Sequence, residues 1–209
     1  GHAVLSRGSP PCRWRFAGVP ATAGISDAEA TAQLAIWLRA DAFRWQCLQT
    51  VRDALPVQAW LAAGFIRNLV WDQQHGYLRP TPLPDIDVIY LDAEQQAPAH
   101  DHHYEALLSA QLAAGWQVRN QALMAARQQH APYPDCASAI RHWPETATCY
   151  AVRLDADNQL QWLAPLGWAP LFAGEVVRNP LFAGGDTVWQ QRLQQKQWRQ
   201  RWPQLRLVT

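Results

Sequence analysis

Between residues 26 and 56 the apolar positions follow helical spacing. The recurring positions are Ala30, Leu34, Trp37 and Leu38, then Phe43, Cys47, Val51 and Leu55. This spacing places each set on one face of a helix. Ser26 with Glu29 is typical of a helix start, and Pro56 ends the second helix because proline interrupts helical hydrogen bonding. The pattern predicts two amphipathic helices.

Short apolar runs then alternate with helical patterns. Strands are expected at 59–63, 85–91 and 116–120, followed by a hairpin of 149–154 with 160–165. Helices are expected at 65–74, around 104–112, from 121 through 124, at 135–142 and at 186–201. The strongest strand signal is 85–91, which follows a proline-rich segment that is neither helix nor central strand. This order predicts an α+β fold in which helices cover a mixed β-sheet.

Composition adds a domain prediction. The chain has 209 residues, with an irregular N-terminal arm expected at 1–25 and a single domain at 26–209. The 12 tryptophans are expected mostly in the core. A net charge of +1 is too small to indicate nucleic-acid binding over a whole surface. No C-x-x-C pair is present, and no apolar run approaches the ~20 residues that span a bilayer. We therefore expect reduced thiols, a cytoplasmic location and no membrane partner.

Asp85 and Asp87 are the candidate chemical centre. Residues i and i+2 of a strand share a face, so both carboxylates should point the same way. Such a pair suits Mg²⁺, which prefers oxygen ligands and keeps positions open for water and phosphate. The alternative is a solvated strand end or a turn. The apolar flanks favour the metal, because an unpaired charge on a buried strand is costly.

Gly64 is the second candidate. It lies between an apolar run and a predicted helix. A glycine at a helix N-terminus exposes backbone N–H groups at the positive end of the helix dipole, which suits a triphosphate.

Several segments, taken in order, resemble one family. They are 63–68, 70–72, 84–90, 118–121, 133 with 139–140, 143–146, 164–167, 171–172, and 198 with 202–203. Together they are similar to a bacterial family of nucleotidyltransferases related to the DNA polymerase beta superfamily, over roughly residues 26 to 206. The resemblance implies a mixed-sheet nucleotidyltransferase fold, an NTP substrate, and Mg²⁺ (or Mn²⁺) as cofactor. Gly64 takes the place of the superfamily's phosphate-site glycine, and Asp85 and Asp87 take the places of its metal-binding pair.

The sequence departs from the superfamily pattern at the phosphate site and at the third carboxylate. Phe65 stands where serine is usual, so Arg67 or Asn68 would have to replace a hydroxyl contact to phosphate. No acid lies in 116–121, the strand expected to supply a third carboxylate. Glu145 and Asp155 are the remaining candidates for it, and without one the general base is lost.

Other polar residues admit two interpretations. For Arg67 a phosphate contact is favoured over a structural ion pair, because a guanidinium binds phosphate through two hydrogen bonds. Asn120 either binds a base or ribose or satisfies buried backbone. For residues 100–103 a solvated loop, with Asp101 as the N-cap of the following helix, is favoured over a metal cluster. For the basic helix at 186–201 a solvated face is favoured over a nucleic-acid contact.

Two functions are compatible with these residues. The first is an enzyme that transfers a nucleoside monophosphate from an NTP to an acceptor, with Asp85 and Asp87 as the catalytic metal ligands. The second is a catalytically degenerate relative that binds a nucleotide or RNA without turnover. The sequence leaves open the acceptor (a small molecule, RNA or protein), the base and the oligomeric state.

Overall fold

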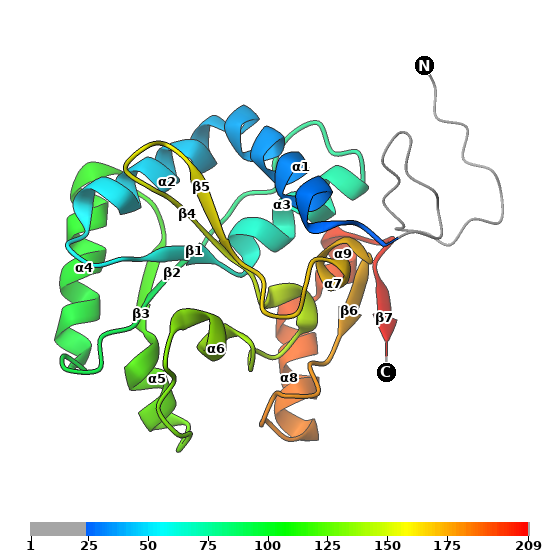
Figure 1. Cartoon of the computed structure of the whole chain (residues 1–209). Coiled ribbons are helices and arrows are strands. Elements are labelled where there is room, and N and C mark those ends of the chain that lie inside the picture. The colour runs from blue at the N-terminus through cyan, green and yellow to red at the C-terminus, as the bar shows by residue number, and fades with distance from the viewer. Residues whose placement is uncertain (1–23, 209) are drawn as a thin grey trace, which may run out of the picture.

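A five-stranded mixed sheet forms the centre of the molecule (Figure 1). The computed structural model describes residues 24–208, so most of the arm predicted at 1–25 lies outside the described residues. The strands are β1 (Trp60–Ala62), β2 (Ile86–Tyr90), β3 (Trp116–Asn120), β4 (Ala151–Leu154) and β5 (Leu160–Leu163). Their order is β3-β2-β1-β4-β5, with β2 and β3 parallel and the other pairs antiparallel. The predicted strands and the predicted α+β class are confirmed.

One face of the sheet carries the main core. Helices α1 (Asp27–Ala40), α2 (Ala42–Ala54), α3 (Gly64–Gln74) and α4 (Pro98–Gln111) pack there, with the short α7 (Ala169–Phe172). Ile86 and Val88 of β2 and Val118 of β3 point into this core. Because side chains alternate along a strand, Asp87 points to the other face of the sheet.

As predicted, Ser26 caps α1 by accepting a hydrogen bond from the Glu29 backbone N–H.

The other face is covered by shorter elements, which lie below the sheet in Figure 1. They are α5 (Gln121–Arg127) and α6 (Cys136–Ile140). Trp60, Ala62 and Ile89 pack there against Cys136 and Ile140. The 3₁₀ turn η1 (Thr146–Thr148) packs instead with the C-terminal elements, where Ala147 joins the cluster around Trp71.

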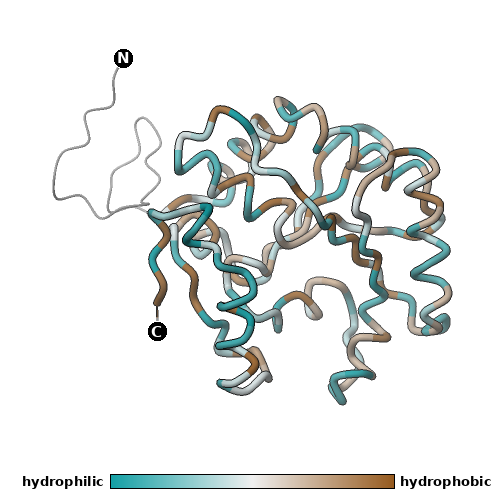
Figure 2. The backbone as a smooth tube through the Cα atoms, turned by 180° about the vertical axis from the view of Figure 1, so that it is seen from behind, coloured by the Kyte–Doolittle hydropathy of each residue, from teal (hydrophilic) through white to brown (hydrophobic). Residues whose placement is uncertain are grey.

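The C-terminal elements pack against α3. They are β6 (Glu175–Val177), α8 (Asp186–Lys196), α9 (Trp198–Arg201) and β7 (Arg206–Val208). Trp71 of α3 meets Trp198 and Trp202 edge to face, and Trp202 Nε1 donates to the buried Asp72. Figure 2 shows α8 as a largely hydrophilic helix. This tryptophan cluster, which includes Trp189 of α8, holds α8 against α3.

Two local predictions are wrong. The helix expected at 186–201 is broken at Gln197, which takes the left-handed conformation (φ 47°) and separates α8 from α9. Asp101 is not a helix cap but lies inside α4, where it is buried and accepts from the Tyr90 hydroxyl and the Asn120 N–H. Within residues 24–208 no helix is long and apolar enough to cross a membrane.

Candidate active site

The two aspartates lie at the start of β2. Asp87 is the second residue of the strand and sits between Ala62 of β1 and Gln117 of β3. Asp85 directly precedes the strand and is exposed, whereas Asp87 is half-buried. Gln117 lines the same cavity as Asp87, and its Nε2 donates to Asp85 Oδ1 at 3.4 Å. The two carboxylates therefore share one side of the sheet.

Close backbone packing fixes the position of Asp85. A Cβ at Gly115 would lie 1.8 Å from the carbonyl oxygen of Pro84, and the Ile86 N–H donates to the Gly115 carbonyl. Only glycine permits this approach between the start of β3 and the residue before Asp85. Gly115, in the loop between α4 and β3, thus shapes the site.

The field around Asp87 contains charges of both signs. Burial raises the pKa of Asp87, and the nearby Asp85 raises it further, while Arg67, Lys196 and Arg119 lower it. A carboxylate in this position is destabilised when ionised unless additional positive charge reaches it. A divalent cation would supply that charge.

The turn from β1 into α3 lies next to the aspartates. Ala63 has a positive φ of 58°, a conformation that is rare for a residue with a side chain. Gly64 is the first residue of α3, and a Cβ there would lie 3.1 Å from Arg67 Nη2 and 3.3 Å from Asn68 Nδ2. The missing side chain lets Arg67 and Asn68 lie over the helix N-terminus.

Arg67 is buried in a polar and aromatic setting. Its Nη1 donates to Thr148 Oγ1 at 2.9 Å and its Nε to Asn68 Oδ1 at 3.1 Å. Its guanidinium also lies 5.2 Å from the ring of Trp71 and 5.0 Å from that of Trp198. Burial lowers the pKa of Arg67 to about 10. The contacts hold Arg67 in place, and Nη2 remains directed at the N-terminus of α3.

Helix α8 brings further positive charge. Arg192 lines the cavity of Asp87, and Lys196 follows one helical turn later, on the same face. The pKa of Lys196 is lowered by desolvation and by Arg192 and Arg67, and raised by Asp87 and Glu145. Among the described residues Lys196 makes no ion pair. Lys196 is exposed, as the interpretation of a solvated face predicts, whereas Arg192 is half-buried and lines the cavity of Asp87, so part of the charge of this helix reaches the site.

Gln117 stands beside Asp87, where the neighbouring strand was expected to supply a third carboxylate. Its Oε1 accepts from Arg119 Nη2 at 3.2 Å, and Arg119 also pairs with Glu105. In residues 24–208 no group of three His, Cys, Asp or Glu side chains is arranged to hold a metal ion. The centre is therefore a pair of carboxylates with an amide beside them.

Glu145 is close to this centre but is fully engaged. It exposes only 1% of its surface and pairs with Arg192, whose Nη2 donates to Oε1 at 2.9 Å. Oε1 also accepts from Thr148 Oγ1 at 2.6 Å. Glu145 therefore has a structural ion pair, and the structure does not present it as a free third carboxylate.

Asp155 belongs to the hairpin turn between β4 and β5. It accepts from the backbone N–H groups of Asp157 and Gln159, which lower its pKa. Ala151 lies level with Asp87 in the sheet, and Asp155 is four residues further along, ~13 Å at the usual strand rise. The structure does not bring Asp155 to the aspartate pair.

Asn120 also lies apart from the carboxylates. Its side chain accepts from the N–H groups of Asp92 and Ala122 and donates to the carbonyls of Asp92 and Gln95. The amide thus holds the loop after β2, which matches the structural alternative. Its expected contact with a base or ribose stays a prediction.

A cavity of about 230 Å³ lies beside Asp87. Asp87, Ile89, Gln117 and Arg119 form its floor on the sheet, and α5, α6 and α8 supply its walls.

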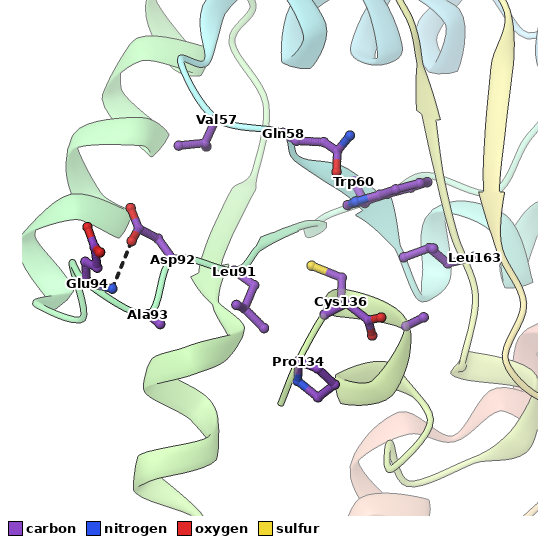
Figure 3. A pocket seen from close by; sticks show the side chains of 12 residues that line it. Val57, Gln58, Trp60, Leu91, Asp92, Ala93, Glu94, Pro134, Cys136 and Leu163 are labelled. Carbon is purple, nitrogen blue, oxygen red and sulfur yellow. Dashed lines mark hydrogen bonds between the residues drawn. The ribbon is translucent and has the colours of Figure 1, made fainter. Parts of the chain in front are cut away.

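A second cavity of about 620 Å³ lies beyond the far end of β2 (Figure 3). Two of its acids serve local structure, since Asp92 accepts from the Glu94 N–H and Asp135 caps α6. Burial raises the pKa of the Cys136 thiol to about 12, which keeps it protonated. None of the residues proposed from the sequence as site residues lines this cavity.

Comparison with solved structures identifies the class of fold. One neighbour, described as a protein whose NMR structure reveals a CCA-adding enzyme head domain, has a TM-score of 0.74 and 24% identity, covering 85% of this chain and 95% of its own. A CCA-adding enzyme solved in complex with CTP has a TM-score of 0.54 and 12% identity, covering 86% of this chain and 43% of its own. The fold is that of a nucleotidyltransferase head domain.

The sequence itself identifies the family. Residues 49–207 match the model of a nucleotidyltransferase family, which covers most of the chain. Among curated proteins, none matches the sequence. The chain belongs to this nucleotidyltransferase family, which confirms the resemblance seen in the sequence.

Proposed function

We propose that this protein transfers a nucleoside monophosphate from an NTP to an acceptor, with Mg²⁺ or Mn²⁺ held by Asp85 and Asp87. The observation that carries the proposal is the half-buried Asp87, which lies beside Asp85 at the N-terminus of a central strand and among cationic side chains. The acceptor (a small molecule, RNA or protein) is left open.

The aspartates suit a hard divalent cation. Both offer carboxylate oxygens on one side of the sheet, and burial of Asp87 favours a partner of positive charge. Magnesium is commonly held by one or two carboxylates together with substrate phosphates. The metal would neutralise charge on the phosphates during transfer. Because two carboxylates leave most ligand positions of the metal to other groups, we expect metal and nucleotide to bind jointly.

The triphosphate would lie between α3 and α8. Helix α3 begins at Gly64, where backbone N–H groups and the positive end of the helix dipole favour an anion, and Arg67 Nη2 and Asn68 Nδ2 lie close to this glycine. Arg192 and Lys196 add positive charge from α8. The similarity to a CCA-adding enzyme solved with CTP supports a nucleoside triphosphate as substrate.

The alternative is a relative that binds the nucleotide without turnover. It is favoured by Gln117, an amide that is unable to act as general base, at the place expected for a third carboxylate. A glutamate at this position would add that carboxylate next to Asp87.

Incubation with α-labelled NTPs, Mg²⁺ and cell extract tests the two functions. We expect a labelled acceptor with the wild type, loss of labelling in Asp87→Asn, and faster labelling in Gln117→Glu. Nucleotide binding without labelling in the wild type would favour the binding-only relative. Labelling by Asp87→Asn at the wild-type rate would refute the proposed site.

A further inference from the structure

The end of the 230 Å³ cavity that lies away from Asp87 is lined by amide, aromatic and apolar side chains. Gln121, Met124 and Gln128 of the α5 segment line it, with Tyr133 and His142 from the segments that flank α6. Gln121 follows Gln117 by four residues, so the cavity extends ~13 Å from the carboxylates along β3. The cavity is smaller than the ~300–1,000 Å³ of sites that enclose a whole ligand. It therefore suits one ring system, with the phosphates outside.

The aromatic side chains at this end of the cavity are held by contacts with one another. The Tyr133 ring stacks on His130 with centroids 4.5 Å apart and lies 5.5 Å from the ring of His142. Met124 adds an adaptable apolar side chain. Flat aromatic walls favour a planar heterocycle, because stacking contributes to the binding of any base.

Three polar groups at this end are open to a ligand. Gln121 exposes 3% of its surface, and its Nε2 donates to the Arg119 carbonyl, which fixes the amide so that Oε1 is the open acceptor. His142 Nδ1 donates to the Ser138 carbonyl, so Nε2 of the neutral ring is also an acceptor. The Tyr133 hydroxyl makes no hydrogen bond within residues 24–208, although Tyr133 exposes only 7% of its surface.

We propose that this end of the cavity binds the nucleobase of the NTP and selects bases that carry an exocyclic amino group next to an unprotonated ring nitrogen on the Watson–Crick edge. The inference rests on the proposed function and adds its base preference. Two acceptors, Gln121 Oε1 and His142 Nε2, match an amino group, and the Tyr133 hydroxyl can donate to the ring nitrogen beside it. Cytosine and adenine present this pattern, whereas uracil and hypoxanthine present a carbonyl next to a ring N–H.

The test measures binding of CTP, UTP, ATP, ITP and inorganic tripolyphosphate by calorimetry with Mg²⁺. Wild type should bind CTP over UTP, and ATP over ITP, by about tenfold or more, because the wrong base leaves buried acceptors unsatisfied. Gln121→Leu should bring both ratios close to one, and Tyr133→Phe should reduce them. Tripolyphosphate binding should be unchanged in both variants.

Tyr104→Phe is the matched control, because Tyr104 packs in the core on the opposite face of the sheet. Equal binding of CTP and UTP by the wild type, or an unchanged ratio in folded Gln121→Leu, overturns the base assignment. If tripolyphosphate still binds and depends on Asp87, the proposed function survives that result. If neither NTPs nor tripolyphosphate bind, both the base assignment and the proposed function fail.

Discussion

Replacing Glu145 by glutamine separates a structural role from a catalytic one. Glu145 is buried, its two oxygens pair with Arg192, and Oε1 also accepts from Thr148. Thr148 in turn accepts from Arg67, so the ion pair connects α8 to α3. Glu145→Gln keeps the shape, removes the charge and turns one acceptor into a donor.

The expected loss of stability is large. Breaking a buried ion pair costs ~3–5 kcal/mol, and the lower end applies because the Arg192 side chain is 26% exposed. For a chain of this size ~3 kcal/mol corresponds to a melting temperature lower by ~6–12 °C. Urea denaturation should show a lower midpoint with an unchanged slope.

A surface ion pair provides the control. Glu175 pairs with Arg206, whose side chain is 47% exposed, so Glu175→Gln should change stability by ~1 kcal/mol or less. If Glu145 were instead the general base, Glu145→Gln would be stable and would lose a ~10²–10⁴-fold factor in rate. Wild-type stability of Glu145→Gln would therefore refute the structural assignment.

Three further variants test the site. In metal-free protein Asp87→Asn should raise the free energy of unfolding at pH 7, because burial raises the pKa of Asp87 and so penalises the ionised folded state of the wild type. Urea denaturation at several pH values should show that this gain in stability disappears as the pH falls from the raised pKa of Asp87 toward 3.8. Lys196 is the only lysine in the sequence, so peptide mass spectrometry after amine labelling should show it protected by NTP with Mg²⁺. Lys196→Gln should weaken tripolyphosphate binding about tenfold or more, and the exposed Arg199→Gln should leave it unchanged. Gly115→Ala should lose ~2 kcal/mol or more in urea denaturation, because its methyl group would meet the Pro84 carbonyl at 1.8 Å.

Local patterns predicted much of the fold and the position of Asp87 on the sheet. The alternation around Asp87 placed this residue on the face opposite Ile86 and Val88, and the residues of β3 were predicted as the structure has them. These features depend on neighbours in sequence, so periodicity reveals them. The proline-rich segment before Asp85 likewise marks where the strand begins.

The sequence did not predict the contacts between elements that lie far apart along the chain. The pairing of Arg192 with Glu145 and the approach of Lys196 to Asp87 depend on the tryptophan cluster that docks α8. The left-handed break at Gln197 carries no glycine signal, and the short strands β6 and β7 pair only after the chain folds back. Lys196, one helical turn after Arg192, was the sequence signal for a basic helix face near the site, but the sequence of a helix alone does not show which of its polar residues lie near another element.

The most direct test of the metal and nucleotide site is a set of melting curves for wild type, Asp85→Asn and Asp87→Asn, each with and without Mg²⁺ and NTP. Metal and NTP together should stabilise the wild type more than either alone, by ~2.7 kcal/mol at a hundredfold excess over Kd. Both variants should match or exceed wild-type stability without ligand, because removing one of two like charges relieves repulsion, and both should lose the response to ligand. Asp85 and Asp87 do not form the metal and nucleotide site if both variants are clearly less stable without ligand and keep the wild-type response to Mg²⁺ and NTP.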